Sequence, residues 1–297
     1  MFGKTERTLI KTIHFVLRPS LDKPANSLFR HNLTGILETS IRSSAAQFES
    51  EEIMKRLDVR LMEASASDKG WDVFSLEYVI DSPLDAIIDD SASVNYLRLF
   101  QYLWKIRRIG YEVVHSNWKG LFERKFILWT REKLCKSKDM AAKRSSLGQY
   151  VRIGEIVHFL NQLQYFMVFE VLECSWKEFV DKMNGQDNDI DSIRELHQKY
   201  IADLMSRSLL NDEKIYPRLM DLLDDILKFS ELAANCVARM ELSLSTPLNQ
   251  LDDEFAQSQW SIVSAKLRQF LSSLQQGSAS NVNVRLLSFR LNFNQFY

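Results

Sequence analysis

Two short patterns in the chain resemble parts of chemical sites, and each lacks residues that the chemistry needs. Gly3-Lys4-Thr5 matches the end of a phosphate-binding loop, but the earlier glycine of such a loop and a preceding strand are missing. Three aspartates have the opening spacing of a calcium loop: Asp187, Asp189 and Asp191. The glycine that this loop requires is replaced by Ser192, and its bidentate glutamate by Gln198. We therefore expect no nucleotide and no calcium at these segments.

The remaining residue types that carry catalysis or bind metals are scattered. The histidines are separated along the chain: His14, His31, His115, His158 and His197. None has a second histidine or a cysteine at metal-ligand spacing, and no serine occurs in a Gly-x-Ser-x-Gly turn. The sequence therefore predicts a protein that is not an enzyme and has no cofactor and no metal. An enzyme whose active site is dispersed between helices remains the alternative from that class.

Composition favours a chain of long helices. Among 297 residues there are only nine glycines and five prolines, while apolar residues make up 45%. Strands need turn residues more often than this. The net charge is −1, and no segment is typical of a signal peptide or a membrane span, so we expect no membrane association. Three distant cysteines, Cys135, Cys174 and Cys236, are typical of a reduced intracellular chain with buried thiols.

One region breaks the helical rhythm. Apolar residues alternate with polar ones in 57–61 and again in 74–80, which predicts a β-hairpin over 57–80. A third alternating run lies in the tail, where Leu287, Phe289 and Leu291 are separated by polar residues. Because two strands alone are marginally stable, we expect 284–293 to add a third strand.

The other elements are predicted to be helices. Apolar side chains recur at steps of three and four over 25–48, from an N-cap at Ser91 or Ser93 towards Lys138, and over 144–183, 190–210, 215–244 and 248–275. The helix over 144–183 is apolar nearly all round, so we expect it at the centre of the domain. The predicted fold is mainly α, a single helical bundle domain over 1–297 with a small β-hairpin or three-stranded sheet.

Charge is segregated along the chain. Segment 119–152 has a net charge of +7 and segment 181–225 a net charge of −5. Such a pattern can steer a protein partner, and it is also compatible with two solvated helix surfaces. The basic segment contains Phe126, Trp129 and Tyr150, but charge without a readout motif is weak support for nucleic-acid binding, and we expect none.

Four segments together resemble the gamma-tubulin complex component family. They are Arg30-His31-Asn32-Leu33-Thr34-Gly35, Gly70-Trp71-Asp72-Val73-Phe74-Ser75-Leu76-Glu77-Tyr78, Val157-His158-Phe159-Leu160-Asn161-Gln162-Leu163-Gln164-Tyr165-Phe166 with its continuation to Trp176, and Val284-Arg285-Leu286-Leu287-Ser288-Phe289-Arg290-Leu291-Asn292-Phe293-Asn294. The resemblance runs in order from about residue 18 to the end. The third segment is similar to the third-component type.

The resemblance implies a helical carboxy-terminal domain that binds one gamma-tubulin and helps to nucleate microtubules at their minus ends. It implies no chemistry of the chain's own, since GTP belongs to the bound gamma-tubulin. Other gamma-tubulin complex components are the further partners, and the implied location is the cytoplasm and the microtubule organising centre, a centrosome or spindle pole body. The amino-terminal half that packs laterally in this family is expected to be absent, and residues 1–8 do not match the family's leader segment.

The family has no short motif that defines its interface, so the candidate contacts for gamma-tubulin are chosen from the matched segments and their surroundings. They are Tyr78, Asp81, Ser82, Pro83, Arg152, Arg290 and Asn292. A strand end followed by proline presents an exposed loop, and the polar residues of the tail are expected on its solvent side. Trp71, Phe74 and Phe289 are expected in the core. A helical interaction module with a different partner remains the second hypothesis.

Overall fold

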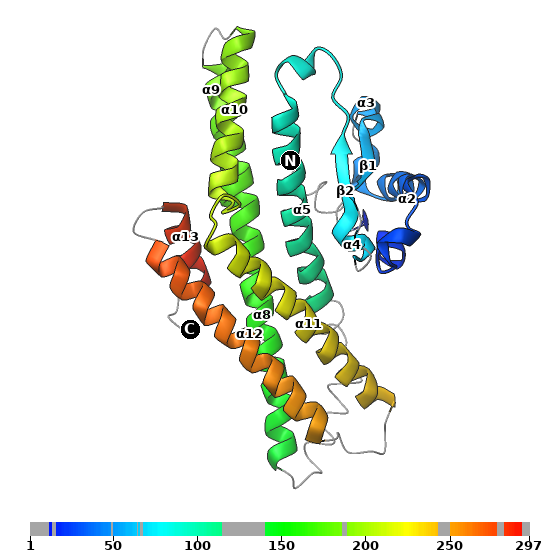
Figure 1. The fold of residues 1–297 in the computed structure, drawn as a ribbon, viewed down its shortest axis with the longest axis vertical. Helices are drawn as coiled ribbons and strands as arrows, with labels where there is room; N and C mark the ends of the chain where they lie inside the picture. The colour runs from blue at the N-terminus through cyan, green and yellow to red at the C-terminus, as the bar shows by residue number, and fades with distance from the viewer. Residues whose placement is uncertain are drawn as a thin grey trace. The chain divides into compact units, whose positions relative to one another are not determined.

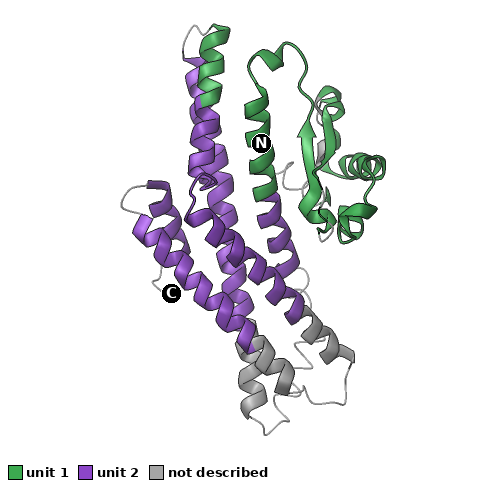
Figure 2. Cartoon of the chain, in the orientation of Figure 1, with its two compact units in different colours: residues 1–102, 187–198 green, residues 103–186, 199–297 purple. Residues whose placement is uncertain are grey.

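The computed structural model describes residues 12–13, 16–48, 50–63, 65, 68–114, 140–185, 189–242, 250–277 and 282–292; the side chains of 45–46, 53, 140–150, 234–242 and 250–256 lie outside this description. The chain divides into two compact units (Figure 2). Unit 1 consists of Met1–Tyr102 and Asp187–Gln198, and unit 2 consists of Leu103–Gln186 and Lys199–Tyr297.

Unit 1 is built around the predicted hairpin. β1 (Leu57–Leu61) pairs with β2 (Phe74–Tyr78) in antiparallel register, with Val59 opposite Leu76. The other elements of this unit are η1 (Ala25–Ser27), α2 (Arg30–Arg42), η2 (Ala45–Phe48), α3 (Glu51–Lys55), α4 (Gly70–Val73), η3 (Leu84–Ala86) and the first part of α5 (Asp90–Glu112). Among the described residues, the sheet has two strands. It is stabilised by α2, which packs against β1 (Figure 1) and leaves Val59 fully buried, because a hairpin gains stability from a helix as well as from a third strand.

The segment Gly70-Trp71 fixes the hairpin connection to the start of the chain. A Cβ atom on Gly70 would lie 2.9 Å from the Cα atom of Leu21, so only glycine fits there. The Trp71 ring is 4% exposed, and its Nε1 donates a hydrogen bond of 2.7 Å to Asp22 Oδ1. The backbone adds hydrogen bonds from Gly70 N to the carbonyl of Lys23 and from Ala25 N to the carbonyl of Asp68. The core assignments of Trp71 and of Phe74, which is 1% exposed, are confirmed.

Unit 2 is a bundle of long helices. Its elements are the end of α5, α8 (Met140–Tyr165), the π-helical segment η5 (Phe166–Glu173), α9 (Cys174–Asn184), the end of α10 (Ile190–Arg207), α11 (Ile215–Leu242), α12 (Gln250–Gly277) and α13 (Val282–Leu291). α8, η5 and α9 form one continuous rod, the predicted central helix (Figure 1). α11 packs along α12, and α13 folds back against α12 and α8.

The middle of the central rod is wider than an α-helix. In η5 the amide of Cys174 donates to the carbonyl of Phe169, five residues earlier, which is the π-helical pattern. The sequence explains why. Five buried residues follow one another at steps of four: Leu163, Met167, Val171, Ser175 and Phe179. At 3.6 residues per turn, four such steps would rotate the buried face by about 160°. The eight residues of η5, at about 4.4 residues per turn, turn through roughly 145° less than eight α-helical residues would, which keeps the buried side chains on one side of the rod.

Charged and polar contacts join the helices of unit 2. Lys105 of α5 lies 2.7 Å from Asp224 of α11, and Lys266 of α12 forms an ion pair with Asp225. Burial favours a higher pKa for the Asp225 carboxyl, but the ammonium groups of Lys266 and Lys228 lower that pKa overall. α5 approaches α8 closely at Gly110, where a Cβ atom would lie 2.4 Å from Gln164 Nε2.

Three sequence-based predictions about elements were wrong. The tail segment 284–293 is not a third strand, because its described part lies in the helix α13. Val284, Leu287 and Leu291 have helical spacing and are buried in unit 2, while Phe289, expected in the core, is 61% exposed. The N-cap of α5 is Asp89 rather than Ser91 or Ser93, since Asp89 Oδ1 accepts a hydrogen bond of 2.7 Å from the amide of Ala92.

We predict that Trp71→Ala will lower the free energy of unfolding by about 3 to 5 kcal/mol, because it removes a buried ring. Trp176→Ala is the matched control, since Trp176 is 54% exposed and its removal opens a smaller cavity. Urea unfolding followed by far-ultraviolet circular dichroism measures both variants. Equal losses for the two tryptophans would contradict the role assigned to Trp71.

Deleting one residue from η5 tests the origin of the wide turn. Without Val168, a wholly α-helical rod would rotate its buried face by only about 60° between Leu163 and Phe179, instead of about 160°. We therefore predict that the chain still folds cooperatively. Removal of Val157 from the regular part of α8 shifts the downstream face by about 100° and should abolish cooperative melting. The interpretation fails if the Val168 deletion melts no better than the Val157 deletion.

Candidate functional site

The predicted contacts in unit 1 lie together on one exposed loop. Tyr78 ends β2 and is 41% exposed. Asp81, Ser82 and Pro83 follow it and are exposed. The last hydrogen bond of the ladder runs from Val79 N to the carbonyl of Arg56 (2.7 Å), and the carbonyl of Asp81 accepts a hydrogen bond of 3.0 Å from Leu84 N, which leads into η3. These bonds hold the loop backbone and leave its side chains available to a partner.

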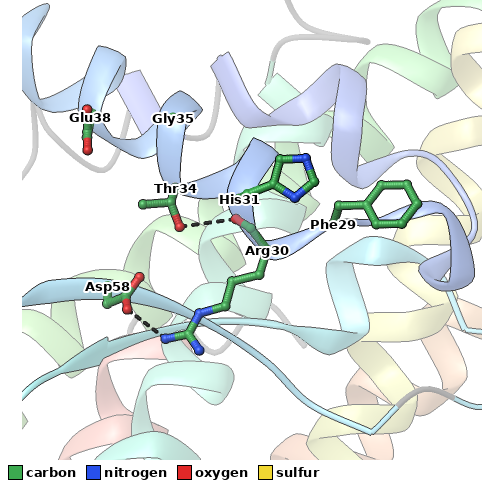
Figure 3. A pocket seen from close by; sticks show the side chains of 7 residues that line it. All are labelled: Phe29, Arg30, His31, Thr34, Gly35, Glu38 and Asp58. Atoms are coloured by element: carbon green, nitrogen blue, oxygen red, sulfur yellow. Dashed lines mark hydrogen bonds and ion pairs between the residues drawn. The ribbon is translucent and has the colours of Figure 1, made fainter.

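A shallow, open groove of about 650 Å³ lies beside α2 in the same unit, and sequence reasoning did not anticipate it (Figure 3). Arg30 crosses its floor to donate a 2.6 Å hydrogen bond to Asp58 Oδ2. Phe29 and His31 lie at one end, with their ring centroids 5.8 Å apart. Gly35 is the sequence signal for the groove. Glycine in the middle of a helix lowers its stability, and no atom lies within 4 Å of the position that a Cβ atom of residue 35 would take, so the space beside the helix is open. Arg30 and Asp58 are paired across the groove, and His31 and Glu38 are the other groups on its lining that can carry charge.

Arg152, the first predicted contact in unit 2, lies on α8 and faces α12. Its guanidinium carbon is 6.0 Å from the centroid of the Trp260 ring, within the range of a cation–π interaction. Glu155, one turn later, has a raised pKa because it is partly buried, although Arg152 and Arg268 oppose that shift. Arg152 therefore has a structural role between two helices, whether or not it also meets a partner.

Arg290 and Asn292 lie at the end of α13. The Arg290 guanidinium donates a short hydrogen bond to Glu170 Oε1 in η5, and its side chain stays 35% exposed. The amide of Asn292 donates to the carbonyl of Ser288 (3.1 Å). Glu170 is eighteen residues beyond Arg152 on the same rod, roughly 25 Å along its axis. Arg152 and Arg290 therefore do not share one small site. Glu170 was missed because it is 120 residues from Arg290 in sequence.

A buried histidine lies between the beginnings of α5 and α10 in unit 1. His197 is 5% exposed, and its Nε2 lies 3.0 Å from the hydroxyl of Tyr96. Burial lowers the pKa of His197, and the carboxylate of Asp89 partly opposes this. Asp89 has its own pKa lowered by the hydrogen bond from the Ala92 amide, with Arg194 among its further charged neighbours. The arrangement favours a neutral imidazole.

Asp189, one of the three aspartates with calcium-loop spacing, has a structural role. Asp189 caps α10 by accepting a hydrogen bond of 2.9 Å from Ser192 N, while Asp187 lies outside the described residues. Within the described ranges, no group of three or more histidine, cysteine or acidic residues is arranged to hold a metal, and no helix is long and apolar enough to cross a membrane. Cys174 is exposed, so the expectation of buried thiols was wrong for it; the side chains of Cys135 and Cys236 are not described.

We predict that His197 destabilises unit 1 in acid. The folded pKa is below the unfolded value of about 6.5, so stability is retained above that pH and declines as pH falls through it, by at most about 1.4 kcal/mol per pH unit. Urea unfolding between pH 7.5 and pH 5 should therefore show a weaker pH dependence for His197→Gln than for the wild type. His158→Gln, an exposed position on α8, is the control. Identical pH slopes for all three proteins would refute the assignment.

Comparison with known proteins identifies the family. The model of the family described as gamma tubulin complex component C-terminal matches residues 7–297. The spindle pole body component alp6 of Schizosaccharomyces pombe is 36% identical over 94% of this chain and 34% of its own length. Gamma-tubulin complex component 3 of Homo sapiens is 32% identical over 97% of this chain and 34% of its own length.

Relatives named as the third component are more similar than those named as the fourth. Gamma-tubulin complex component 4 of Arabidopsis thaliana is 26% identical over 87% of this chain. The third-component resemblance is thus confirmed, and the chain spans about a third of the length of the curated relatives named above. This chain belongs to the gamma-tubulin complex component family and matches the family's carboxy-terminal domain.

Proposed function

We propose that this chain is a gamma-tubulin-binding scaffold that positions gamma-tubulin so that microtubules nucleate at their minus ends. The observation that carries the proposal is the family match over residues 7–297, together with relatives whose names place them in gamma-tubulin complexes and spindle pole bodies. Other components of such complexes are the further partners. The corresponding location is the cytoplasm, at a centrosome or spindle pole body, and neither nucleic acid nor a membrane takes part.

The physical character of the described residues supports a scaffold rather than an enzyme. The groove beside α2 holds a paired arginine and aspartate, and His197 is buried against Tyr96 instead of lining an open cavity. Close packing of long helices, such as α11 along α12, favours a rigid support, and ion pairs such as Lys105 with Asp224 add contacts between helices. A rigid support lowers the entropy lost on binding, which is what a nucleating scaffold needs. The chain contributes no chemistry, and GTP stays with gamma-tubulin.

Two surfaces supply the proposed contacts. In unit 1 they are the loop residues Tyr78, Asp81, Ser82 and Pro83, and in unit 2 they are Arg152, Arg290 and Asn292. The unit 1 loop offers exposed side chains on a hydrogen-bonded backbone. In unit 2 the ion pair with Glu170 holds the Arg290 side chain in one position, so binding there would order few additional rotamers.

We predict a one-to-one complex with gamma-tubulin. Size exclusion with light scattering should show the mass of gamma-tubulin increased by the 34.7 kDa of this chain, whereas αβ-tubulin should elute unchanged. Absence of a complex, from a chain whose circular dichroism shows native helix, would contradict the proposal. Equal binding to both tubulins would instead favour an interaction module with a different specificity.

A charge exchange separates the structural role of Arg290 from a contact with the partner. Arg290→Glu breaks the pair with Glu170 and should weaken gamma-tubulin binding. The double variant R290E/E170R restores a pair in reversed orientation and should recover the melting temperature. If Arg290 also contacts gamma-tubulin, affinity stays reduced by roughly tenfold in the double variant. Full recovery of affinity would restrict Arg290 to the structural role.

A further inference from the structure

The last two helices of unit 2 have an unusual charge content. From Phe255 to Tyr297 the chain contains no aspartate and no glutamate, while it contains Lys266, Arg268, Arg285 and Arg290. The rest of the chain has 39 acidic residues, so this stretch differs clearly in character. The described parts of the stretch are most of α12 and all of α13, which pack against each other.

The four cations are not equivalent. Lys266 pairs with Asp225 of α11 and Arg290 pairs with Glu170 of η5, so both are committed within unit 2. Arg268 is exposed, and its charge favours a lower pKa for Glu155. Arg285 is exposed on α13, and no acidic side chain among the described residues forms an ion pair with it. The positive charge that remains available to a partner is therefore centred on Arg285 and Arg268.

Apolar side chains lie around this charge. On α13, Val282 is 61% exposed, Leu286 is 41% exposed and Phe289 is 61% exposed. Their spacing of four and three places them on one side of the helix, next to Arg285 and away from the buried Val284. Several large apolar side chains exposed on one short helix are typical of an interaction site.

We propose that the exposed side of α12 and α13, centred on Arg285, Leu286 and Phe289, is the surface that binds the partner protein, and that the partner presents carboxylates among apolar side chains. This inference rests on the proposed function, and it specifies which side of unit 2 faces gamma-tubulin. The charge content carries it, because arginines on a stretch of helix that has no acidic residue of its own attract an acidic protein and repel a basic one. Depletion of charge around an apolar centre is also the composition of interface cores.

A protein partner explains the surface better than the other anionic partners do. Nucleic-acid binding depends on many phosphate contacts. Of the four cations on α12 and α13, Lys266 and Arg290 form ion pairs within unit 2, which leaves Arg268 and Arg285 for a partner. Membrane-surface helices are rich in lysine and arginine along the whole polar side, whereas α13 has ten residues and two arginines. The apolar area needs a partner that buries it fully.

The test measures gamma-tubulin binding to the immobilised chain by interferometry, with Arg285→Glu and Leu286→Asp as the main variants. Both positions are exposed, so the variants should keep the wild-type helix content. Arg218→Glu, an exposed arginine on α11, and Ile190→Asp, a 64% exposed apolar residue, are the matched controls. We expect each α13 variant to lose roughly tenfold or more in affinity, with the controls unchanged. The R285E association rate should also depend less on salt than that of the wild type.

Four outcomes separate the hypotheses. Loss of affinity confined to the α13 variants supports the proposal. If both α13 variants bind gamma-tubulin as tightly as the wild type, the proposed binding surface is wrong, while the proposed function stands. A wild-type chain that is folded but binds no gamma-tubulin overturns both. Sedimentation of the wild type, but not of R285E, with vesicles of equal parts phosphatidylcholine and phosphatidylserine would identify a membrane site and overturn the protein surface.

Discussion

The wide turn in the central rod is the constraint on which unit 2 depends. Leu163, Met167, Val171, Ser175 and Phe179 are buried at steps of four, a spacing that a regular α-helix rotates away from its core. The π-helical hydrogen bond from Cys174 to Phe169 shows how the backbone absorbs that rotation. Glu170 lies within the widened segment and accepts a hydrogen bond from Arg290 of α13. A π-helical segment is often found at functional sites, and here it supports the helix that carries the proposed binding surface.

The packing of α13 follows from this support. One side of α13 contributes Val284, Leu287 and Leu291 to the core, so the other side must face outward with Val282, Leu286 and Phe289. A soluble helix normally carries polar residues there. Retaining large apolar residues beside an arginine costs solubility, and a partner that covers them supplies a physical reason. Charged contacts also join α11 to α5 and to α12.

Much of the fold could be predicted from the sequence, and the exceptions have physical causes. Alternation predicted both hairpin strands, and the near-continuous apolar character of 153–171 predicted the central rod. The tail was misassigned because Leu287 and Leu291 fit both period two and a helix, while Phe289 completed the alternation although it faces away from the core; the neighbouring helices decided between the two structures. Asp89 was missed as a cap because two serines follow it closely. The steps of four were visible in the sequence and could have indicated the wide turn. The ion pair between Arg290 and Glu170 could not be predicted, since it joins residues 120 apart.

Hydrogen–deuterium exchange of the chain, alone and with saturating gamma-tubulin, tests the proposed binding surface most directly. Because Leu163 and Met167 are buried, exchange around them should be slow in the free chain and change little on binding. The account predicts that binding slows exchange in α13 and in the adjoining part of α12. Slowing elsewhere in the chain, with α13 exchanging at the same rate in both states, would contradict it.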